Sequence, residues 1–394
     1  MGRKMRICFV GYNANANGSV MNTTRRQAEH LANSGHEVLL ISNREATWDT
    51  VTYLDPGNDS ETRKLSYIVN GIFRRLPKSL SAIDIREYYV QSRFVNRIEN
   101  LFLSSELLQK CDGIVCCQHF VTFALSKIRK QFGIPYVLVA HGDIFTHPRK
   151  AFPIAVRRFY QRAARHAYQN ADLLVAVSSS LAKRAVELGR CESTVEVIAN
   201  GIDVGELGEQ PNVVRQDRGA THLLYVGRLS PEKNVSCLLK ALVRLKDLNI
   251  VTTIVGEGPE RKRLEAAAQH AKINSVTFVG YVHRKGLASY YASCDIVVLP
   301  SLTEAQPVTT LEAGIASRPI IAADVGGVAD VVKNRVTGVL YSSDSVSELE
   351  NAIRELATDS ALRYKMGVNA RAAVEDYRWP NVLSRFCSAI EKTF

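Results

Sequence analysis

Short apolar runs alternate with segments of helical periodicity along the whole chain. The runs are rich in β-branched residues, and they cover 6–12, 36–42, 112–118, 134–141, 171–178, 193–200, 221–227, 249–256, 275–280, 294–300, 318–324 and 337–341. The helical segments between them include 22–32, 235–246, 260–271 and 346–357, where apolar residues recur three or four positions apart. Strand and helix alternate on both sides of the midpoint. The pattern predicts an α/β protein with two doubly wound parallel-sheet, Rossmann-like domains.

The length of the chain also favours two domains, since 394 residues exceed what one hydrophobic core organises efficiently. The best boundary lies in 204–220, which is polar, contains glycine and proline, and has no period. We therefore expect a first domain over 1–203 and a second over 204–377. Ligands of open parallel sheets bind beyond the carboxyl ends of the strands, so the chemistry is expected in strand-to-helix loops facing a cleft.

One such loop is YVGRLSPEKN at 225–234. Ser230 is predicted to cap a helix whose first residue is Pro231. Arg228 and Lys233 would then flank the helix N-terminus. Two cations and free backbone N–H groups make an anion site suited to a diphosphate, although an ordinary turn with surface charges has the same spacing.

Two further glycine-rich turns follow predicted strands. VGEGPE at 255–260 has Pro259 positioned to open a helix, and DVGGVAD at 324–330 contains Gly326 and Gly327. Glycine lets the backbone approach a ligand closely. Each turn alone is a weak signal, but three in one half of the chain indicate a binding site.

SLTEAQPVTTLEA at 301–313 follows the apolar run 294–300. Glu304 is predicted in the loop, and Pro307 as the first residue of a helix that carries Glu312. Carboxylates accept hydrogen bonds from paired hydroxyls such as those of a sugar or a ribose. The two glutamates would therefore meet different parts of an extended ligand; the alternative is two solvated charges near a helix start.

The order of these motifs, GRLSPEKN, VGEGPE, the pair Glu304 and Glu312, and GGVAD, closely resembles the C-terminal domain of the family-4 retaining glycosyltransferases with the two-Rossmann GT-B fold. The resemblance covers most of 200–341 and is only general in the first half. It implies a nucleotide-sugar donor, such as a UDP or GDP sugar, held mainly by the second domain. It implies neither a metal nor another cofactor.

The resemblance also implies roles for individual residues. Arg228 and Lys233 would bind the donor diphosphate, Glu304 would face the donor sugar, and Glu312 would bind the ribose hydroxyls. Asn200 and Gly201 match the family's hinge turn. The resemblance also implies that the C-terminal helix, 378–394, packs back onto the first domain. Further donor contacts, mostly from the backbone, are expected at Gly256, Tyr281, Val282, Gln306, Pro307, Val308 and Thr309.

The chain departs from the family pattern in two loops. EAQP stands where most members have E-G-F-G, and Pro307 removes one N–H donor there. The loop after the first strand, YNANANGSV, separates Gly11 from Gly18, whereas the family usually has adjacent glycines. Gly18 is our candidate for a phosphate contact, because its backbone is free to adopt unusual angles and offers a donor.

Two histidines follow strands of the first half. His141 in VLVAHGD matches the family's histidine, which is implied to lie nearest the reacting carbon and to orient donor and acceptor. With Glu304, Arg228 and Lys233 it completes the expected catalytic set. His119 is a secondary candidate for the acceptor side. A lone histidine after a strand is otherwise more often a capping or packing residue.

The charge is unevenly distributed. The net charge is +11, of which residues 1–200 carry +10 and the remainder +1. This asymmetry indicates an anionic partner for the first half or a basic solvated surface. Segment 63–78 has the basic amphipathic pattern of a helix that lies on an anionic membrane, but a helix covering its own sheet looks much the same. With the resemblance, the acceptor is expected to be a glycan or another small molecule, lipid-linked or phosphorylated, and no nucleic acid partner is expected.

The cysteines and the length of the apolar runs indicate the cellular compartment of the protein. The eight cysteines form no CxxC pair and several lie in apolar runs, which predicts reduced, buried thiols rather than a metal site. No apolar run approaches 18 residues, so we expect no membrane span. These features favour a cytoplasmic protein, with peripheral attachment to the inner face of the membrane as an alternative.

The sequence therefore predicts a metal-independent retaining hexosyltransferase that acts on an acceptor hydroxyl. A nucleotide-sugar epimerase of the same architecture and a non-catalytic glycosyltransferase-like subunit remain open. A dinucleotide-dependent dehydrogenase is disfavoured, because no G-x-G-x-x-G follows the first strand.

Overall fold

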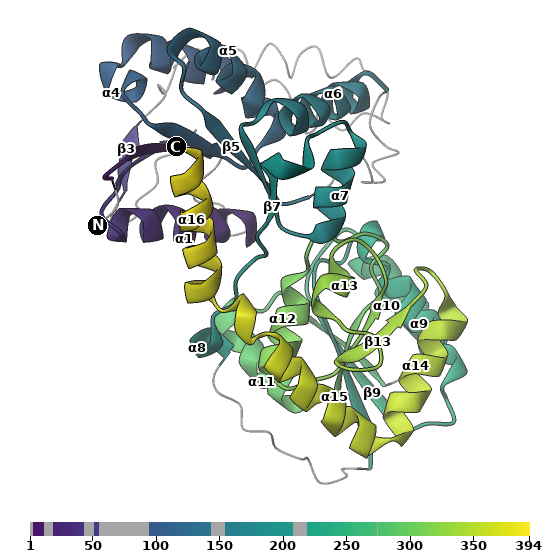
Figure 1. The fold of residues 1–394 in the computed structure, drawn as a ribbon. Helices are drawn as coiled ribbons and strands as arrows, with labels where there is room; N and C mark the ends of the chain where they lie inside the picture. Colours follow the sequence, from purple (N-terminus) through teal and green to yellow (C-terminus); the bar gives the residue numbers. More distant parts are fainter. Residues whose placement is uncertain are drawn as a thin grey trace. The chain divides into compact units, whose positions relative to one another are not determined.

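The computed structural model describes residues 3–11, 19–42, 51–54, 94–142, 154–207, 219–273 and 275–394. The chain divides into two compact units (Figure 1). Unit 1 comprises Met1–Val177, Leu181–Ile198 and Leu383–Phe394, and unit 2 comprises Ser178–Ser180 and Ala199–Val382. Gly18 and segment 63–78, both singled out by the sequence, lie outside the described residues.

The described part of unit 1 is built on a seven-stranded sheet with the order β3-β2-β1-β4-β5-β6-β7, and every pair is parallel. Its strands are β1 (Arg6–Gly11), β2 (Glu37–Ser42), β3 (Thr52–Leu54), β4 (Gly113–Cys116), β5 (Tyr136–Ala140), β6 (Leu173–Ala176) and β7 (Val195–Val197). The central strands are buried along nearly their whole length, which explains their continuous apolar runs. Six of the seven strands match predicted runs. The edge strand β3 was not predicted, because three partly exposed residues leave no pattern.

The helices of unit 1 alternate with these strands. They include α1 (Ser19–Asn33), α4 (Glu106–Gln109), the 3-10 turn η1 (His119–Val121), α5 (Thr122–Phe132), α6 (Ile154–Asn170), α7 (Ser179–Glu187) and the 3-10 turn η2 (Glu192–Thr194). Residues 94–104 are also helical. Helix α5 ends at Gly133, whose φ of 72° closes the helix in a left-handed conformation. A core of residues such as Phe102, Leu125 and Tyr136 fills the space between sheet and helices.

Unit 2 contains, in its described part, a six-stranded parallel sheet with the order β10-β9-β8-β11-β12-β13. Its strands are β8 (Thr221–Val226), β9 (Ile250–Val255), β10 (Val276–Gly280), β11 (Ile296–Leu299), β12 (Ile320–Ala323) and β13 (Gly338–Tyr341). The chain winds outward from β8 in one direction and resumes at β11 in the other. The loops after β8 and β11 therefore flank the topological switch point of the sheet, where ligands of such folds bind.

Helices cover both faces of this sheet. They are α8 (Val204–Leu207), η3 (Pro231–Lys233), α9 (Val235–Arg244), α10 (Arg261–His270), η4 (Arg284–Gly286), α11 (Leu287–Ser293), α12 (Val308–Ile315), α13 (Val328–Val331), α14 (Val346–Thr358), α15 (Ser360–Ala373) and η5 (Glu375–Tyr377). Leu223 and Tyr225 of β8 belong to one apolar cluster, and Leu224 between them belongs to another. The predicted α/β fold with two parallel sheets is confirmed.

Proline positions at the helix starts differ from the prediction. Pro231 opens the 3-10 turn η3, and α9 begins only at Val235, after Asn234 with a φ of 47°. Helix α10 begins two residues after Pro259. Pro307 is the N-cap of α12 in an extended conformation, with a ψ of 120°, rather than its first residue. Proline lacks an N–H group, so it is tolerated on either side of a helix start, and the sequence alone does not fix which.

The predicted boundary segment also contains structure. Val204–Leu207 forms the short helix α8, and Val204 packs against an apolar cluster of unit 2. This contact explains why residues without a helical period are ordered.

The last helix, α16 (Trp379–Thr393), begins in unit 2 and ends in unit 1. At its start, the backbone N–H of Trp379 donates to the carbonyl of Ile202 at 3.3 Å. At its end, the Phe394 ring occupies the space where a side chain on Gly113 would stand. The last residues of the chain therefore pack against a strand of unit 1.

Candidate functional site

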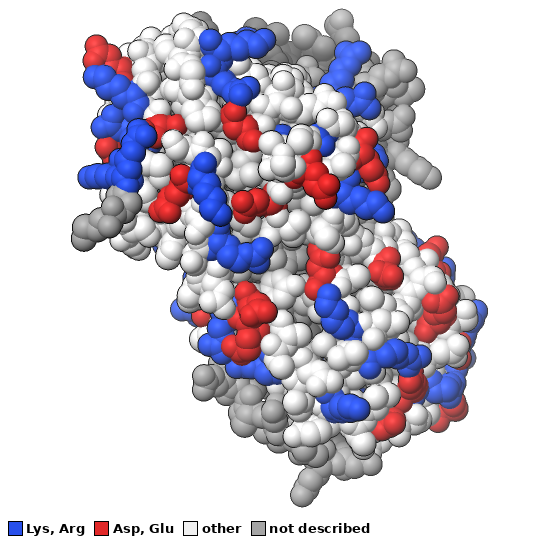
Figure 2. All heavy atoms as spheres, in the orientation of Figure 1, with Lys and Arg blue, Asp and Glu red and all other residues white. Residues whose placement is uncertain are grey.

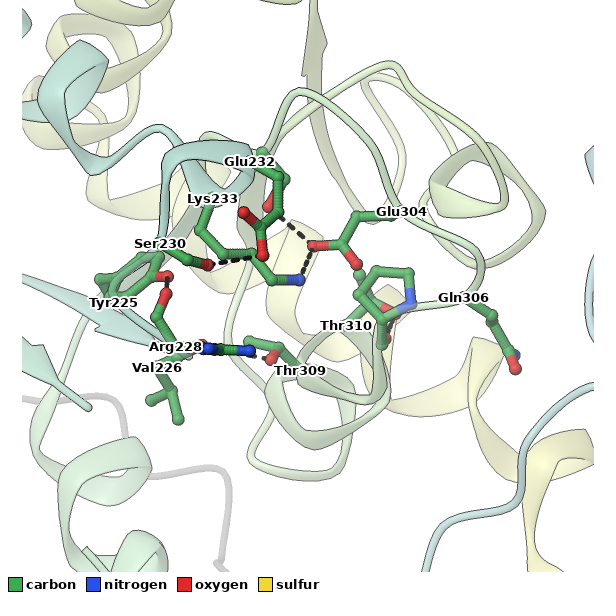
Figure 3. Close-up of polar contacts among 12 residues, drawn as sticks. Tyr225, Val226, Arg228, Ser230, Glu232, Lys233, Glu304, Gln306, Thr309 and Thr310 are labelled. Atoms are coloured by element: carbon green, nitrogen blue, oxygen red, sulfur yellow. Dashed lines mark hydrogen bonds and ion pairs between the residues drawn. The ribbon is translucent and has the colours of Figure 1, made fainter. Parts of the chain in front are cut away.

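The site is formed where the loops after β8 and β11 meet at the switch point of the unit 2 sheet (Figure 3). The backbone N–H of Leu302 donates to the carbonyl of Glu232 at 2.8 Å. The Thr309 hydroxyl donates to the carbonyl of Val226 at 3.4 Å. These bonds fix two loops that are about 70 residues apart in the chain against each other, so their side chains share one site.

Lys233 and Glu304 form an ion pair between these loops. Lys233 Nζ lies 2.6 Å from Glu304 Oε1, and the two side chains are 24% and 8% exposed. The Ser301 hydroxyl donates to the same carboxylate oxygen at 2.7 Å. Figure 3 shows the ammonium and the carboxylate pointing toward each other. Two of the four predicted catalytic side chains are thus in direct contact.

Arg228 lies on the same loop and is exposed. Its carbonyl accepts a hydrogen bond from the Tyr225 hydroxyl at 2.9 Å. Burial raises the pKa of Tyr225, which keeps that hydroxyl a neutral donor. Within the described residues no carboxylate pairs with the Arg228 guanidinium, which extends toward Thr309 in Figure 3. The guanidinium is therefore available to an anion.

Glu312 lies on α12 and is only 6% exposed. Its Oε2 accepts a hydrogen bond from the Tyr291 hydroxyl at 2.7 Å, and its Oε1 lies 3.9 Å from Arg284 Nη2. Burial and the neighbouring carboxylate raise the pKa of Tyr291 well above its ordinary value. Tyr291 and Arg284 were not predicted, because nothing in the pattern of YVHRKGLASYY distinguishes them from ordinary helix residues.

Gln306 and Asn200 bind each other in unit 2. The Gln306 carbonyl oxygen Oε1 accepts the backbone N–H of Asn200, and Asn200 Nδ2 donates to the Gln306 main-chain carbonyl at 3.5 Å. Gln306 Nε2 is buried and has no hydrogen-bond partner among the described residues. Figure 3 shows the Gln306 amide pointing away from Lys233. This side chain therefore ties the turn at Asn200 to the start of α12.

The helix start itself offers donors. Helix α12 begins at Val308, so the N–H groups of Val308 and Thr309 have no acceptor within the helix. The N–H of Thr310 is already bound to the carbonyl of Pro307 at 3.1 Å. Backbone donors thus remain beside Glu304, as expected for binding hydroxyls or a phosphate.

The glycine-rich turns pack against these loops. A Cβ on Gly256, where φ is 143°, would stand 1.9 Å from the carbonyl oxygen of Gly227. A Cβ on Gly326 would stand 1.6 Å from the carbonyl oxygen of Glu304. The glycines are predicted to lie at a ligand site, and in the structure they let the backbone of the neighbouring loop approach closely. In the loop after β10, Val282 is half-buried and Tyr281 is 70% exposed.

The two candidate histidines lie in unit 1, at the carboxyl ends of the neighbouring strands β4 and β5. His141 follows β5 and is half-buried. His119 opens η1 and lies edge-on to Tyr168, with ring centroids 5.3 Å apart. Burial lowers the pKa of His119 to about 4, and its Nε2 has no partner in the described part of the chain. His119 is therefore a neutral imidazole at physiological pH.

The charges of unit 1 are partly neutralised by neighbours. Among the described cations, Arg6 pairs with Glu37 at 2.9 Å and Arg129 pairs with Asp172 at 2.6 Å. Figure 2 shows acidic side chains among the lysines and arginines on this face of the molecule. Pairing reduces the basic surface that the composition suggests.

The cysteines, the possible metal ligands and the possible membrane spans can now be located in the described part of the chain. Seven of the eight cysteines are buried and Cys191 is exposed. Burial raises the pKa of Cys117 to about 11, which keeps its thiol protonated. Across the described ranges no three histidine, cysteine or acidic side chains gather as a metal would require. The described helices include none with the length and hydropathy of a membrane span.

Two family models match the chain. The model described as Glycosyltransferase Family 4 matches residues 20–206. The model described as Glycosyl transferases group 1 matches residues 208–373. Each model corresponds closely to one half of the fold, and together they leave only the chain ends and a short junction unmatched.

Individual proteins are similar over long regions. A glycogen synthase of Mycobacterium tuberculosis is 30% identical over 282 residues, which are 63% of this chain and 66% of that protein. The matched region thus spans just under two thirds of that curated relative's length. Sucrose-phosphate synthase from Thermosynechococcus elongatus superimposes with a TM-score of 0.79 at 19% identity, covering 99% of both chains.

A second solved structure is HepE of Anabaena in complex with UDP-glucose, with a TM-score of 0.72 at 18% identity, covering 98% of this chain and 100% of that one. At these identities the structures establish the fold. The two family models, which follow one another over nearly the whole sequence, establish the lineage: the chain belongs to the family-4 glycosyltransferases with the GT-B fold.

Proposed function

We propose that the protein transfers a sugar from a nucleotide-diphosphate sugar to an acceptor hydroxyl with retention of the anomeric configuration. The observation that carries the proposal is the meeting of Arg228, Lys233 and Glu304 at the switch point of the unit 2 sheet. The donor domain would cover 204–377, and 1–203 with the tail 378–394 would serve the acceptor.

The diphosphate would bind between Arg228 and Lys233. The Arg228 guanidinium is exposed and offers a planar fork to phosphate oxygens. The Lys233 ammonium has three donors, of which Glu304 occupies one. Charge develops on the leaving diphosphate during transfer, so two preorganised cations would lower the barrier by about 3 kcal/mol or more.

The rest of the donor would follow α12. Glu304 would accept hydrogen bonds from the sugar, together with the backbone N–H groups of Gln306, Val308 and Thr309; Pro307 can add only packing. Glu312, fixed by the Tyr291 hydroxyl, would accept both ribose hydroxyls. The nucleobase would lie along the backbone of Gly256, Tyr281 and Val282.

Two side-chain cations could replace a metal in offsetting the leaving-group charge, so transfer is expected to survive chelation. The described side chains of the site include no nucleophile paired with a base, and the leaving phosphate would therefore take the proton of the incoming hydroxyl. His141 would lie nearest the reacting carbon, with His119 and Gly18 as secondary contacts. Because the similarly folded HepE was solved with UDP-glucose, UDP sugars are the first donors to test.

The acceptor proposal rests on the charge of the first half. Residues 1–200 carry a net charge of +10, which would favour a phosphorylated or lipid-linked acceptor at the cytoplasmic face of a membrane. Vesicle flotation with and without anionic lipid tests the membrane part, and equal partition into both would remove it.

Replacing Lys233 by alanine tests the site. We expect K233A to lower the turnover of a UDP sugar with acceptor by at least about 100-fold, because it removes a preorganised charge from the leaving group. Product formation with isotopically labelled donor is the measurement, and an unchanged melting temperature shows that the fold is retained.

Lys240 on α9 is an exposed lysine that supplies a matched control. K240A should leave turnover unchanged. Near-normal turnover of K233A would contradict the proposal. Donor consumption without any acceptor would instead favour the epimerase.

A further inference from the structure

The pairing of Lys233 with Glu304 has a consequence for the product of the reaction. Lys233 Nζ lies 2.6 Å from Glu304 Oε1, and the carboxylate is 92% buried, since its side chain is 8% exposed. The Ser301 hydroxyl anchors the same oxygen at 2.7 Å. The carboxylate is thus held in place against the ammonium.

The two cations of the site are not equivalent. Arg228 is exposed and has no carboxylate partner among the described residues, whereas Lys233 is half-buried and neutralised. A diphosphate can approach Arg228 directly. To gain the full strength of Lys233, it must compete with a buried, charge-assisted hydrogen bond.

We propose that Glu304 is an internal competitor that discriminates the nucleotide-sugar donor from the nucleoside diphosphate product. The inference rests on the proposed function. With the donor bound, sugar hydroxyls donate to Glu304 and the ammonium can turn to the diphosphate. Once the sugar has left, the carboxylate loses those donors and returns to Lys233, so the product is held mainly by Arg228 and leaves faster. No bond is made or broken in this exchange; only hydrogen-bond partners change.

The test is the affinity of the full chain for UDP, measured by calorimetry, with GDP and ADP as further probes. We expect E304Q to bind the nucleoside diphosphate about tenfold more tightly than the unmodified chain, the size of one hydrogen bond to a charged group. E304D keeps the negative charge but moves it away from the Lys233 ammonium by the length of one methylene group. It should also bind more tightly, by a smaller factor.

The double variant separates competition for Lys233 from a general field effect. In K233A/E304Q the gain of E304Q should vanish, because no ammonium remains to be released. D247N removes an exposed carboxylate that pairs with Arg354 in the turn between α9 and β9, and it should leave affinity unchanged.

Two results would overturn the inference. One is equal or weaker binding of UDP by E304Q and E304D, and the other is an undiminished gain of E304Q on the K233A background. Failure of all three nucleotides to bind any variant would instead count against the proposed function. Melting temperatures of each variant show whether it is folded, and E304D keeps the test open if E304Q is not.

Discussion

At the scale of single residues, His119 couples the stability of unit 1 to pH. Burial lowers its folded-state pKa to about 4, whereas an unfolded histidine titrates near its ordinary value of 6.5. The unfolded chain therefore binds the proton more readily between these values. Stability is fully present above about pH 6.5 and is lost as the pH falls toward about 4.

The H119N variant should lose this dependence. We expect the unmodified chain to lose about 3 kcal/mol of stability over that pH window through His119, and the variant to lose less by roughly that amount. Melting temperatures at pH 7, 5.5 and 4.5 measure the difference. Parallel pH profiles for the two proteins would show that the imidazole is not buried in the neutral form.

The Tyr291 hydroxyl positions the Glu312 carboxylate, so a substitution of Tyr291 tests the role of that position while the carboxylate itself is kept. Y291F deletes the hydroxyl that donates to Glu312 Oε2 and so removes one hydrogen bond to a buried carboxylate. We expect about tenfold weaker UDP binding, with turnover at saturating donor changed by less than about twofold, because ribose binding precedes the chemistry.

The neighbouring Tyr290 is the matched control, since Y290F leaves the hydroxyl of Tyr291 in place. A fall in saturated turnover of Y291F as large as its loss of affinity would contradict a purely positioning role for this hydroxyl.

At the scale of elements, the loops of the site are built on one another. Gly326 has a φ of 55°, and a Cβ there would stand 1.6 Å from the carbonyl oxygen of Glu304. G326A should therefore destabilise the protein by about 3 kcal/mol or more and displace Glu304, weakening UDP binding. Urea denaturation and calorimetry measure the two effects.

Gly219 is the control for this prediction, because its φ of 74° is also positive but a Cβ there would meet nothing within 4 Å. G219A should cost only about 1 kcal/mol and leave UDP binding unchanged. Equal losses in the two variants would show that backbone strain, rather than packing against Glu304, determines the effect.

The elements themselves were largely predictable. Apolar β-branched runs marked each strand longer than three residues in the described chain, because strands buried on both faces need continuous apolar sequence. The helix starts near Pro231, Pro259 and Pro307 were less predictable. Proline marks a boundary without fixing which side of it is helical, and the local hydrogen bonds decide.

At the scale of the whole molecule, the sequence motifs predicted which residues form the candidate site but not which of them contact each other. Lys233 and Glu304 meet because β11 lies beside β8, and strand order depends on packing between distant segments rather than on local periodicity. The ion pair, the Tyr291 bond to Glu312 and the return of α16 to unit 1 all depend on such long-range packing. Local sequence carries no signal for the ion pair or for the Tyr291 bond, and the return of the last helix was expected only from the family resemblance.

The central claim is that unit 2 binds the diphosphate of a nucleotide between Arg228 and Lys233. A crystal structure of the full chain with an intact UDP sugar tests it most directly. The account predicts phosphate oxygens within about 3 Å of both the Arg228 guanidinium and Lys233 Nζ, with the ribose hydroxyls at Glu312. A nucleotide bound elsewhere, with both cations facing solvent, would contradict it.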